Sequence, residues 1–280
     1  MKGISKSSIC IVAGLLAACV LCAPSRADIY RVDVNVQNPG QGGTWAAAFD
    51  DLEGALYAAE QHEDEDEIWV AEGTYYPSEE QIQYDPRSVA FNLDDEDPVK
   101  IYGGFAGTED YLYERDIYAN PTILSGDLDQ DDDYTTFPDD IWIDRDDNAY
   151  HVITGSATTD PMDGARVDGF TIIGGTADGV YDLWGGGASN GGDMYVRCTF
   201  CWNRAKTGGG AFVSADNDVI IYNCRFYNNI AAEGDLDQTR KIGREGAIFL
   251  GRDVEAHIID GDFNVDESAD QLIDDISASR

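Results

Sequence analysis

The chain has 280 residues, and its 54 acidic side chains against 18 basic ones give a formal net charge of −36. Nucleic-acid recognition needs clustered lysine and arginine, so we expect no nucleic-acid partner. Hydrophobic residues make up 43% of the sequence, which excludes an entirely disordered chain.

The N-terminal residues have the features of an export signal. Lys2 and Lys6 supply a positive start, an apolar stretch runs from Ile9 to Cys22, and small residues precede Asp28. The apolar stretch, about 14 residues, is short for a membrane span. We therefore expect a secreted or cell-surface (extracellular) protein with no transmembrane span after signal removal.

A lipid-anchored form is the alternative, because residues 16–19 (Leu-Ala-Ala-Cys) fit a lipoprotein signal that attaches lipid to Cys19. Loss of the signal peptide, residues 1–27, removes three basic residues and no acidic ones, so the mature charge is 15 − 54 = −39. Such a surface repels polyuronates at long range unless divalent cations bridge the two.

The mature chain keeps three cysteines, Cys198, Cys201 and Cys224. An odd and low number does not make a disulfide framework, and the sequence leaves open whether Cys198 and Cys224 are free or bonded. The Cys-x-x-Cys spacing at 198–201 lies in a strand-like run and not at the start of a helix, so thioredoxin chemistry is not expected.

Residues 28–67 are expected to form an N-terminal strand and a capping helix. Side chains 29–36 alternate between polar and apolar, as in a strand. Thr44 can cap a helix over 45–61, where apolar side chains repeat every three or four residues. These apolar positions are Trp45, Phe49, Leu52, Leu56 and Ala59. We expect the helix to cover the open end of the strands that follow.

From residue 68 on, short apolar runs recur, and each is closed by glycine or by a polar turn. Many short strands without helices between them exclude a doubly wound α/β fold and leave a sandwich, a barrel or a solenoid. The runs begin at Ile68, Ile101, Ile123, His151 and Phe170.

Internal similarity favours the solenoid. Residues 198–205 align with residues 224–231 at a constant offset of 26, and residues 261–266 form a weaker third copy. A unit of about 23–30 residues with three short strands fits one rung of a parallel β-helix.

Stacked rungs place equivalent side chains in columns. The alternation slips in phase at Asn223, which predicts a corner there and turns Arg225 outward. The expected columns are Phe200, Phe226 and Phe263; Cys198 and Cys224; and Asn203, Asn229 and Asp266.

We therefore predict an all-β fold, a right-handed parallel β-helix (solenoid) over residues 68–267 with an N-terminal capping α-helix. Acidic loop insertions are expected near 127–148 and 232–243. Residues 268–280 are expected to form a short C-terminal cap or tail, because they open with a capping box.

These motifs resemble the pectin-lyase-like superfamily of right-handed parallel β-helices. The Gly-Gly-Ala and Phe-x-x-Asn pairs look like the repeats of chlamydial polymorphic outer-membrane proteins and of secreted bacterial β-helix repeat proteins. The segments Gly43–Trp45, Ile68–Pro77, Tyr102–Phe105, Ile123–Asp127 and Val167–Ile172 look like the N-terminal module of the second group. The resemblance, over residues 30–265, implies a fold and leaves the function open, because this superfamily includes lyases, hydrolases and adhesins.

Residues 127–148 hold ten aspartates and one basic residue, Arg145. Alternating oxygen ligands suit a hard cation such as Ca²⁺, although Asp132 and Pro138 stand where an EF-hand needs glycine and glutamate. A solvated acidic loop is the alternative. The candidate metal ligands are Asp127, Asp129, Asp131, Asp144, Asp146 and Asn148.

The sequence assigns no catalytic residues. It lacks a nucleophile elbow, a phosphate loop and metal-ligand spacing among its histidines, and Ca²⁺ is the one cofactor considered. We expect a non-catalytic cell-surface or extracellular-matrix component that binds extracellular polysaccharide or cell-surface glycans. The alternative is a secreted polysaccharide lyase or glycoside hydrolase with a calcium-assisted acidic site.

Two kinds of side chain are candidates for glycan contact. Arg197, Arg204 and Arg225 lie on the repeats and can bind an acidic sugar or pair with neighbouring carboxylates. Aromatic side chains can stack on neutral sugars or pack on neighbouring rungs. The aromatic candidates are Trp142, Trp184, Trp202, Tyr181 and Tyr227.

Overall fold

The structure is a computed structural model. It describes residues 28–61, 66–93, 99–132, 145–155, 161–162, 164–179, 185–190, 192–207, 211–214, 218–233, 240–242, 248–250, 256–259 and 262–263. The expected signal peptide, the C-terminal segment 268–280, Asp266 and parts of both loop insertions lie outside these ranges. Within them, no helix combines the length and the apolar character needed to cross a membrane.

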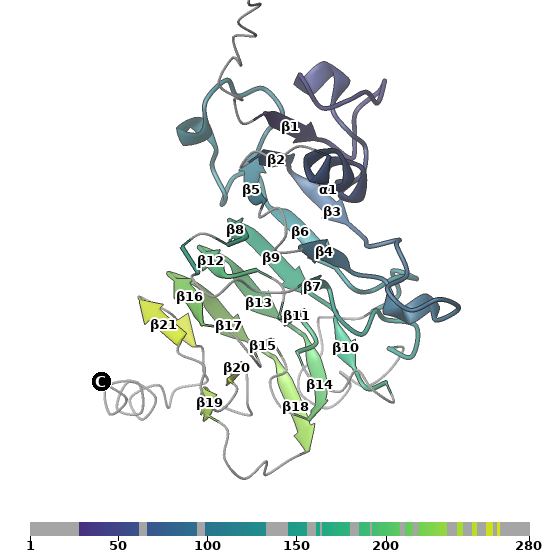
Figure 1. The fold of residues 1–280 in the computed structure, drawn as a ribbon, viewed down its shortest axis with the longest axis vertical. Coiled ribbons are helices and arrows are strands. Elements are labelled where there is room, and N and C mark those ends of the chain that lie inside the picture. Colours follow the sequence, from purple (N-terminus) through teal and green to yellow (C-terminus); the bar gives the residue numbers. More distant parts are fainter. Residues whose placement is uncertain are drawn as a thin grey trace, which may run out of the picture.

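The described strands form four sheets (Figure 1), each named here after its lowest-numbered strand. The β1 sheet holds β1 (Ile29–Val32), β2 (Glu67–Ala71), β5 (Lys100–Phe105), β8 (Arg166–Asp168), β12 (Met194–Val196), β16 (Val219–Tyr222) and β21 (Ala256–Ile259). The β3 sheet holds β3 (Gly73–Tyr75), β6 (Thr122–Ser125), β9 (Phe170–Ile173), β13 (Thr199–Cys201), β17 (Arg225–Tyr227) and β22 (Asp262–Phe263).

Two further sheets complete the set. The β4 sheet holds β4 (Phe91–Leu93), β7 (Ile153–Gly155), β11 (Ala188–Ser189), β15 (Phe212–Ser214), β20 (Ile248–Leu250) and β19 (Arg240–Ile242). The β10 sheet holds β10 (Thr176–Ala177), β14 (Arg204–Thr207) and β18 (Ile230–Glu233). Among these strands, β19 and β20 are the one antiparallel pair.

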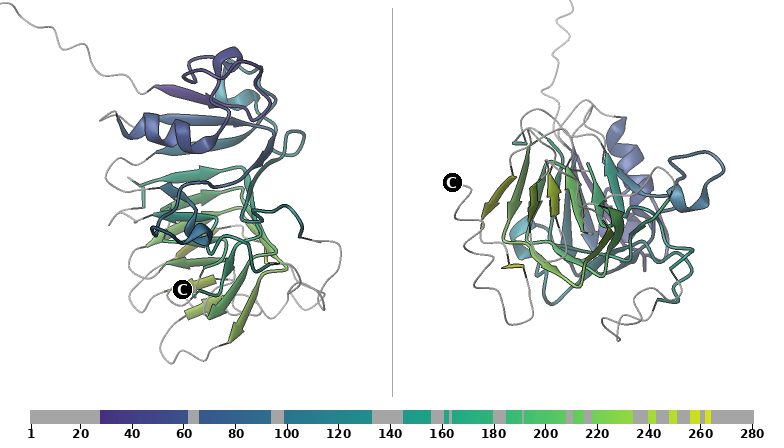
Figure 2. Two further views of the ribbon diagram at one scale, coloured as in Figure 1. Left: turned by 90° about the vertical axis from the view of Figure 1, so that its right-hand side faces the viewer. Right: turned by 90° about the horizontal axis from the view of Figure 1, so that it is seen from below.

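The chain visits the sheets in a fixed order. From β8 it passes through the β1, β3, β10 and β4 sheets, and β12 then returns to the β1 sheet directly beside β8. Figure 2 shows the strands stacked in successive layers. Buried side chains of the β1, β3 and β4 sheets belong to one hydrophobic core. The predicted all-β class with parallel strands is confirmed.

The N-terminal helix is shorter than the sequence predicts. Residues Trp45–Ala47 form a 3-10 turn, and the α-helix α1 covers only Leu52–Glu60. Phe49 interrupts the expected helix because its amide donates to Arg31 O and its carbonyl accepts from Asp33 N, both at 2.8 Å. Asp51, and not Thr44, caps the helix by accepting from the Gly54 amide.

Helix α1 packs at the N-terminal end of the stack against β1, β2 and β4 (Figures 1 and 2). Its inner side chains Leu52, Ala55, Leu56 and Ala59 join the main core. Two more 3-10 turns, Pro86–Ser88 and Leu112–Glu114, lie in connections between strands.

The predicted columns form where the structure describes them. The rings of Phe200 and Phe226 stack with centroids 5.0 Å apart, and the Cys198 amide donates to the Cys224 sulfur at 3.4 Å. Asn203 Nδ2 donates to Asn229 Oδ1 at 3.1 Å. Phe263 pairs with Phe226 in backbone register.

The corner between the β1 and β3 sheets repeats from pass to pass. Gly169, Arg197 and Asn223 occupy it with φ values of 87°, 53° and 51°. The predicted corner at Asn223 is confirmed, and Arg225 is exposed as expected. This corner places Arg197 beside Asp168, the last residue of β8.

Candidate functional site

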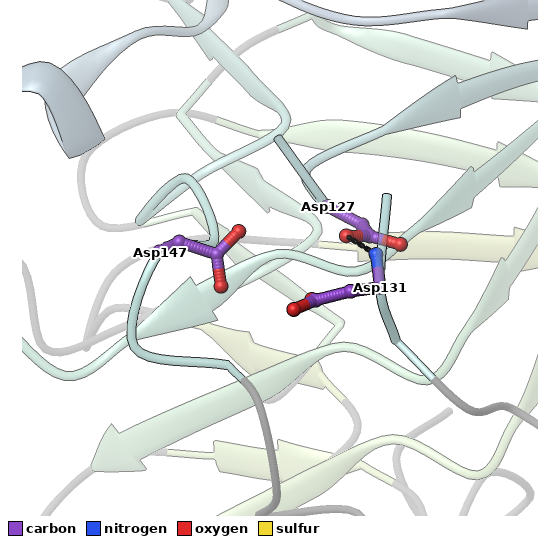
Figure 3. Close-up of side chains that lie close together, drawn as sticks. All are labelled: Asp127, Asp131 and Asp147. Carbon is purple, nitrogen blue, oxygen red and sulfur yellow. Dashed lines mark hydrogen bonds between the residues drawn. The ribbon is translucent and has the colours of Figure 1, made fainter. Parts of the chain in front are cut away.

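Three aspartates meet where two loops approach each other (Figure 3). One carboxylate oxygen from each of Asp127, Asp131 and Asp147 lies within 4.8 Å of the other two. Asp127 follows β6 and is buried, Asp147 is half-buried and Asp131 is exposed.

Backbone amides hold this aspartate cluster in place. Asp127 Oδ1 accepts from the Asp131 amide at 3.1 Å, and its Oδ2 accepts from the Asp132 amide at 3.3 Å. Asp147 Oδ2 accepts from the Asp129 amide at 3.1 Å, which ties the two loops together. These bonds fix the positions of the Asp127 and Asp147 side chains.

The predicted metal ligands take different positions. Asp127 and Asp131 are brought together, whereas Asp129 contributes only its amide and Asp146 is exposed. Asn148 is buried and donates from Nδ2 to Asp132 Oδ2 at 2.9 Å and to the Gly174 carbonyl. Asp144 lies outside the described residues.

Sequence alternation missed Asp147. Residues 146–148 form a bend, so their side chains do not alternate as they do in a strand. Three carboxylates at this spacing can share a hard cation, and Ca²⁺ completes its six to eight oxygen ligands with backbone carbonyls and water.

A second cluster surrounds Asp168 at the end of β8. Its carboxylate is fully buried, and Arg115 Nη2 donates to Oδ1 at 2.7 Å. Arg166 Nη2 donates to Oδ2 at 2.6 Å, and Arg197 donates to both oxygens from Nη2, at 2.8 and 3.0 Å. Three guanidinium groups therefore share one carboxylate.

Local geometry brings these arginines together. Arg166 and Asp168 lie two residues apart on β8, so both point away from the core. Arg197 follows β12, the next strand of the same sheet, in the left-handed corner conformation. Arg115 crosses over Gly169, where a Cβ atom would lie 3.2 Å from Arg115 Nη1 and 2.7 Å from Ile117 Cγ2.

The arginine cluster, Arg115, Arg166 and Arg197, exceeds its carboxylate by two positive charges, because three guanidinium groups face one Asp168. Burial lowers the pKa of Arg115, and the charge of Asp168 opposes that effect. The side chain of Arg115 is 5% exposed, whereas those of Arg166 and Arg197 are 32% and 39% exposed. The two outer arginines therefore reach solvent.

One buried tyrosine contacts the arginine cluster, and three more lie in the loop that supplies Arg115. The buried ring of Tyr102 lies 5.1 Å from the guanidinium carbon of Arg115 and 5.7 Å from that of Arg166. In the loop that supplies Arg115, Tyr111 and Tyr113 stack at 5.4 Å, and the ring of Tyr118 lies 5.9 Å from the Arg225 guanidinium.

Only part of this arrangement could be predicted from the sequence. Of the three arginines predicted to cluster on the repeats, Arg197 and Arg225 lie at or after the corner between the β1 and β3 sheets, whereas Arg204 lies on β14 in the β10 sheet. The Arg-x-Asp-Gly string at 166–169 is the signal that was missed, since it places two opposite charges on one strand face before a corner.

The aromatic residues that the sequence suggested for glycan contact are not the exposed tyrosines of residues 111–118. Trp142, Trp184 and Tyr181 lie outside the described residues, and Trp202 and Tyr227 are half-buried. The carbonyl of Trp202 accepts from Arg145 Nη1 at 2.6 Å. The exposed tyrosines of residues 111–118 lie in a polar loop, where no periodicity marks them.

A third feature is a cleft of about 310 Å³ beside α1. Its acidic lining residues are Glu53, Glu60, Glu79 and Glu80. Burial raises the pKa of Glu53, and the Ser78 amide, which donates to its Oε1 at 2.6 Å, opposes that effect.

The three described cysteines are free and buried. Burial raises the pKa of Cys201 to about 11 and that of Cys224 well above its usual range. Thiolates are therefore disfavoured, which agrees with a packing role for the Cys-x-x-Cys segment.

No protein-family model matches the chain, and no curated protein or solved structure matches it either.

Proposed function

We propose that this protein is a secreted right-handed parallel β-helix that acts as a non-catalytic cell-surface or extracellular-matrix component and binds glycans on one outer face. The path of the chain supports the helical form, because the passes that begin at β8 and β12 each add one strand to every sheet. A solenoid of this kind offers a long surface for an extended ligand.

The exposed tyrosines of residues 111–118, the loop that supplies Arg115, carry the proposal. Tyr111, Tyr113 and Tyr118 are 57%, 78% and 74% exposed, so their rings are open to a ligand. Aromatic faces pack on apolar faces of other rings, and guanidinium groups donate to hydroxyl and carboxylate oxygens. Together these groups supply the two kinds of contact that a sugar chain requires.

The surroundings of Asp168 support binding without catalysis. A general base must reach the proton that it removes, but Asp168 is fully buried and both its oxygens accept from guanidinium groups. Asp168 thus serves to orient the arginines.

A glycan array and a panel of polysaccharides test the proposal. We expect the secreted protein to bind glycans on the array and to release neither reducing ends nor unsaturated products from any polysaccharide. Product release, or the absence of binding to every glycan, would contradict it.

The alternative function is cleavage of a polysaccharide, and the acidic cleft beside α1 favours it. A buried glutamate with a raised pKa is the usual form of a general acid in glycoside hydrolysis. If the protein cleaves a glycan and Glu53→Gln abolishes the cleavage while Glu79→Gln does not, this alternative replaces the first proposal.

Calcium belongs to the proposal as a structural ion. Three aspartate carboxylates close together repel one another, and a divalent cation removes that repulsion. The aspartate cluster joins the loop after β6 to the segment that starts at Arg145, so a bound ion would stabilise this connection and not the arginine cluster.

A further inference from the structure

We infer that the two outer arginines, Arg166 and Arg197, bind the carboxylate of an isolated acidic sugar within an otherwise neutral glycan. This inference rests on the proposed glycan-binding function and names its ligand. The ligand class follows from the donors, the local charge and the overall charge of the chain.

The donors are already oriented. Asp168 uses Nη2 of Arg166 and both Nε and Nη2 of Arg197, at distances of 2.6 to 3.1 Å. Nη1 of each arginine forms no hydrogen bond with the described residues. Since a guanidinium carries five N–H donors, both side chains keep donors for a second carboxylate.

Because Asp168 already holds these guanidinium groups in place, a ligand that binds them restricts their rotamers little further. Long exposed side chains lose rotamer freedom when they bind, and that loss weakens binding. Here the buried Asp168 carboxylate already restrains Arg166 and Arg197. Arg115 is held in turn, because its Nη1 donates to the Gly103 and Asp168 carbonyls at 2.9 and 3.0 Å. The site is therefore preorganised.

The local charge is positive in a strongly acidic chain. The arginine cluster and Asp168 together carry two positive charges, because three guanidinium groups face one carboxylate. Glu67 and Lys100 are direct cross-strand neighbours on β2 and β5, so their opposite charges balance each other. A single carboxylate is attracted to this patch.

A densely charged polymer is not favoured. The whole chain carries a formal charge of −36, so every carboxylate beyond the first meets a surface of its own sign. At physiological salt the screening length is about 8 Å, and one bound carboxylate experiences mainly the arginine cluster. A glycan with one acidic residue among neutral sugars fits better than a polyuronate.

Tyr118 extends the site beyond the arginines. Its ring is 74% exposed and lies 5.9 Å from the guanidinium carbon of Arg225. Arg225 begins β17 and pairs with Thr199 of β13, the strand that follows the Arg197 corner. Neutral sugars next to the acidic one can stack there. We therefore expect affinity from both charge and ring contact.

Isothermal titration calorimetry with two matched oligosaccharides tests the inference. One carries a single glucuronic acid, and the other is its carboxyl-reduced form. We expect the acidic oligosaccharide to bind about tenfold more tightly, because a charged hydrogen bond contributes that much. Arg197→Ala and Arg166→Ala should each remove most of this difference, whereas Lys206→Ala, the loss of an exposed positive charge on β14, should preserve it.

The outcomes separate the inference from the proposed function. Equal binding of the two oligosaccharides, or an unchanged preference in both arginine variants, overturns the inference while glycan binding stands. Failure of the protein to bind any glycan overturns both. Circular dichroism of each variant must match that of the parent, and Arg197→Lys, which keeps the charge but loses the fork geometry, should show an intermediate preference.

Discussion

The ring of Phe226 lies flat against that of Phe200, with centroids 5.0 Å apart and planes 4° from parallel. The two residues are 26 positions apart in the chain and face each other directly in the register of β13 and β17. This contact joins one pass of the chain to the next, so the interior depends on it.

Replacement of Phe226 by alanine should destabilise the protein. The side chain is 2% exposed, and removal of a buried phenylalanine costs about 3–5 kcal/mol. We expect the melting temperature to fall by roughly 10 °C. Tyr57→Ala, at a position 64% exposed, is the control and should change it little. Equal melting temperatures for parent and Phe226→Ala would mean that the rings do not stack in solution.

Asn203 is predicted to be irreplaceable in the corner ladder. Its Oδ1 accepts from the Gly175 amide at 3.1 Å, and its Nδ2 donates to the Ile172 carbonyl at 2.9 Å. Asn203→Ala leaves both buried groups without a partner, at a cost of about 2–4 kcal/mol in the free energy of unfolding. Asn35→Ala, on an exposed turn, serves as the matched control. A loss below 1 kcal/mol, roughly the worth of one ordinary bond, would exclude the ladder.

Stability should decline at alkaline pH. Burial raises the pKa of Cys201 in the folded state to about 11, from an ordinary value of 9.0. The unfolded chain then loses this proton first, so the stabilisation is complete below pH 9 and disappears as the pH rises through 11. Burial also raises the pKa of Tyr195, so this residue contributes to the same loss of stability at alkaline pH.

Urea denaturation between pH 8 and 11 measures this decline, at roughly 1.4 kcal/mol per pH unit for each such group.

In the same samples, thiol reagents at pH 8 should leave Cys198, Cys201 and Cys224 unmodified until the protein unfolds, because all three are buried. Rapid labelling of the folded protein would contradict the packing role.

Millimolar Ca²⁺ should raise the melting temperature, and a chelator should reverse the effect. Asp131→Asn and Asp147→Asn each remove a carboxylate from the aspartate cluster, so both variants should lose this response. Asp146→Asn changes an exposed neighbour outside the cluster and should keep it. Identical melting curves with and without calcium in the parent protein would show that these residues form a solvated loop.

Much of the fold could be predicted from the sequence because stacking leaves a regular trace. The spacing of Phe200 and Phe226, the corner at Asn223 and the outward direction of Arg225 all follow from alternation along short strands. The predicted start of the N-terminal helix was wrong, because Phe49 fits the helical spacing but its backbone bonds to Arg31 and Asp33 at β1. Local periodicity does not encode such a tertiary contact.

The candidate sites were less accessible to prediction. Arg115 reaches Asp168 from 53 residues away, and only the fold brings the two together. Asp147, and not the predicted Asp146 or Asn148, joins Asp127 in the aspartate cluster, because the backbone bends at 146–148. A composition rich in aspartate indicates a region, but it does not identify which oxygens converge.

Hydrogen–deuterium exchange with a bound glycan tests most directly whether the outer face with Tyr118 and Arg197 is the binding surface. The account predicts that a glycan selected on the array slows exchange in residues 111–118 and 194–197 and leaves the cleft beside α1 unchanged. Protection confined to the segments around Glu53 and Glu79, with none at the arginine cluster, would contradict it.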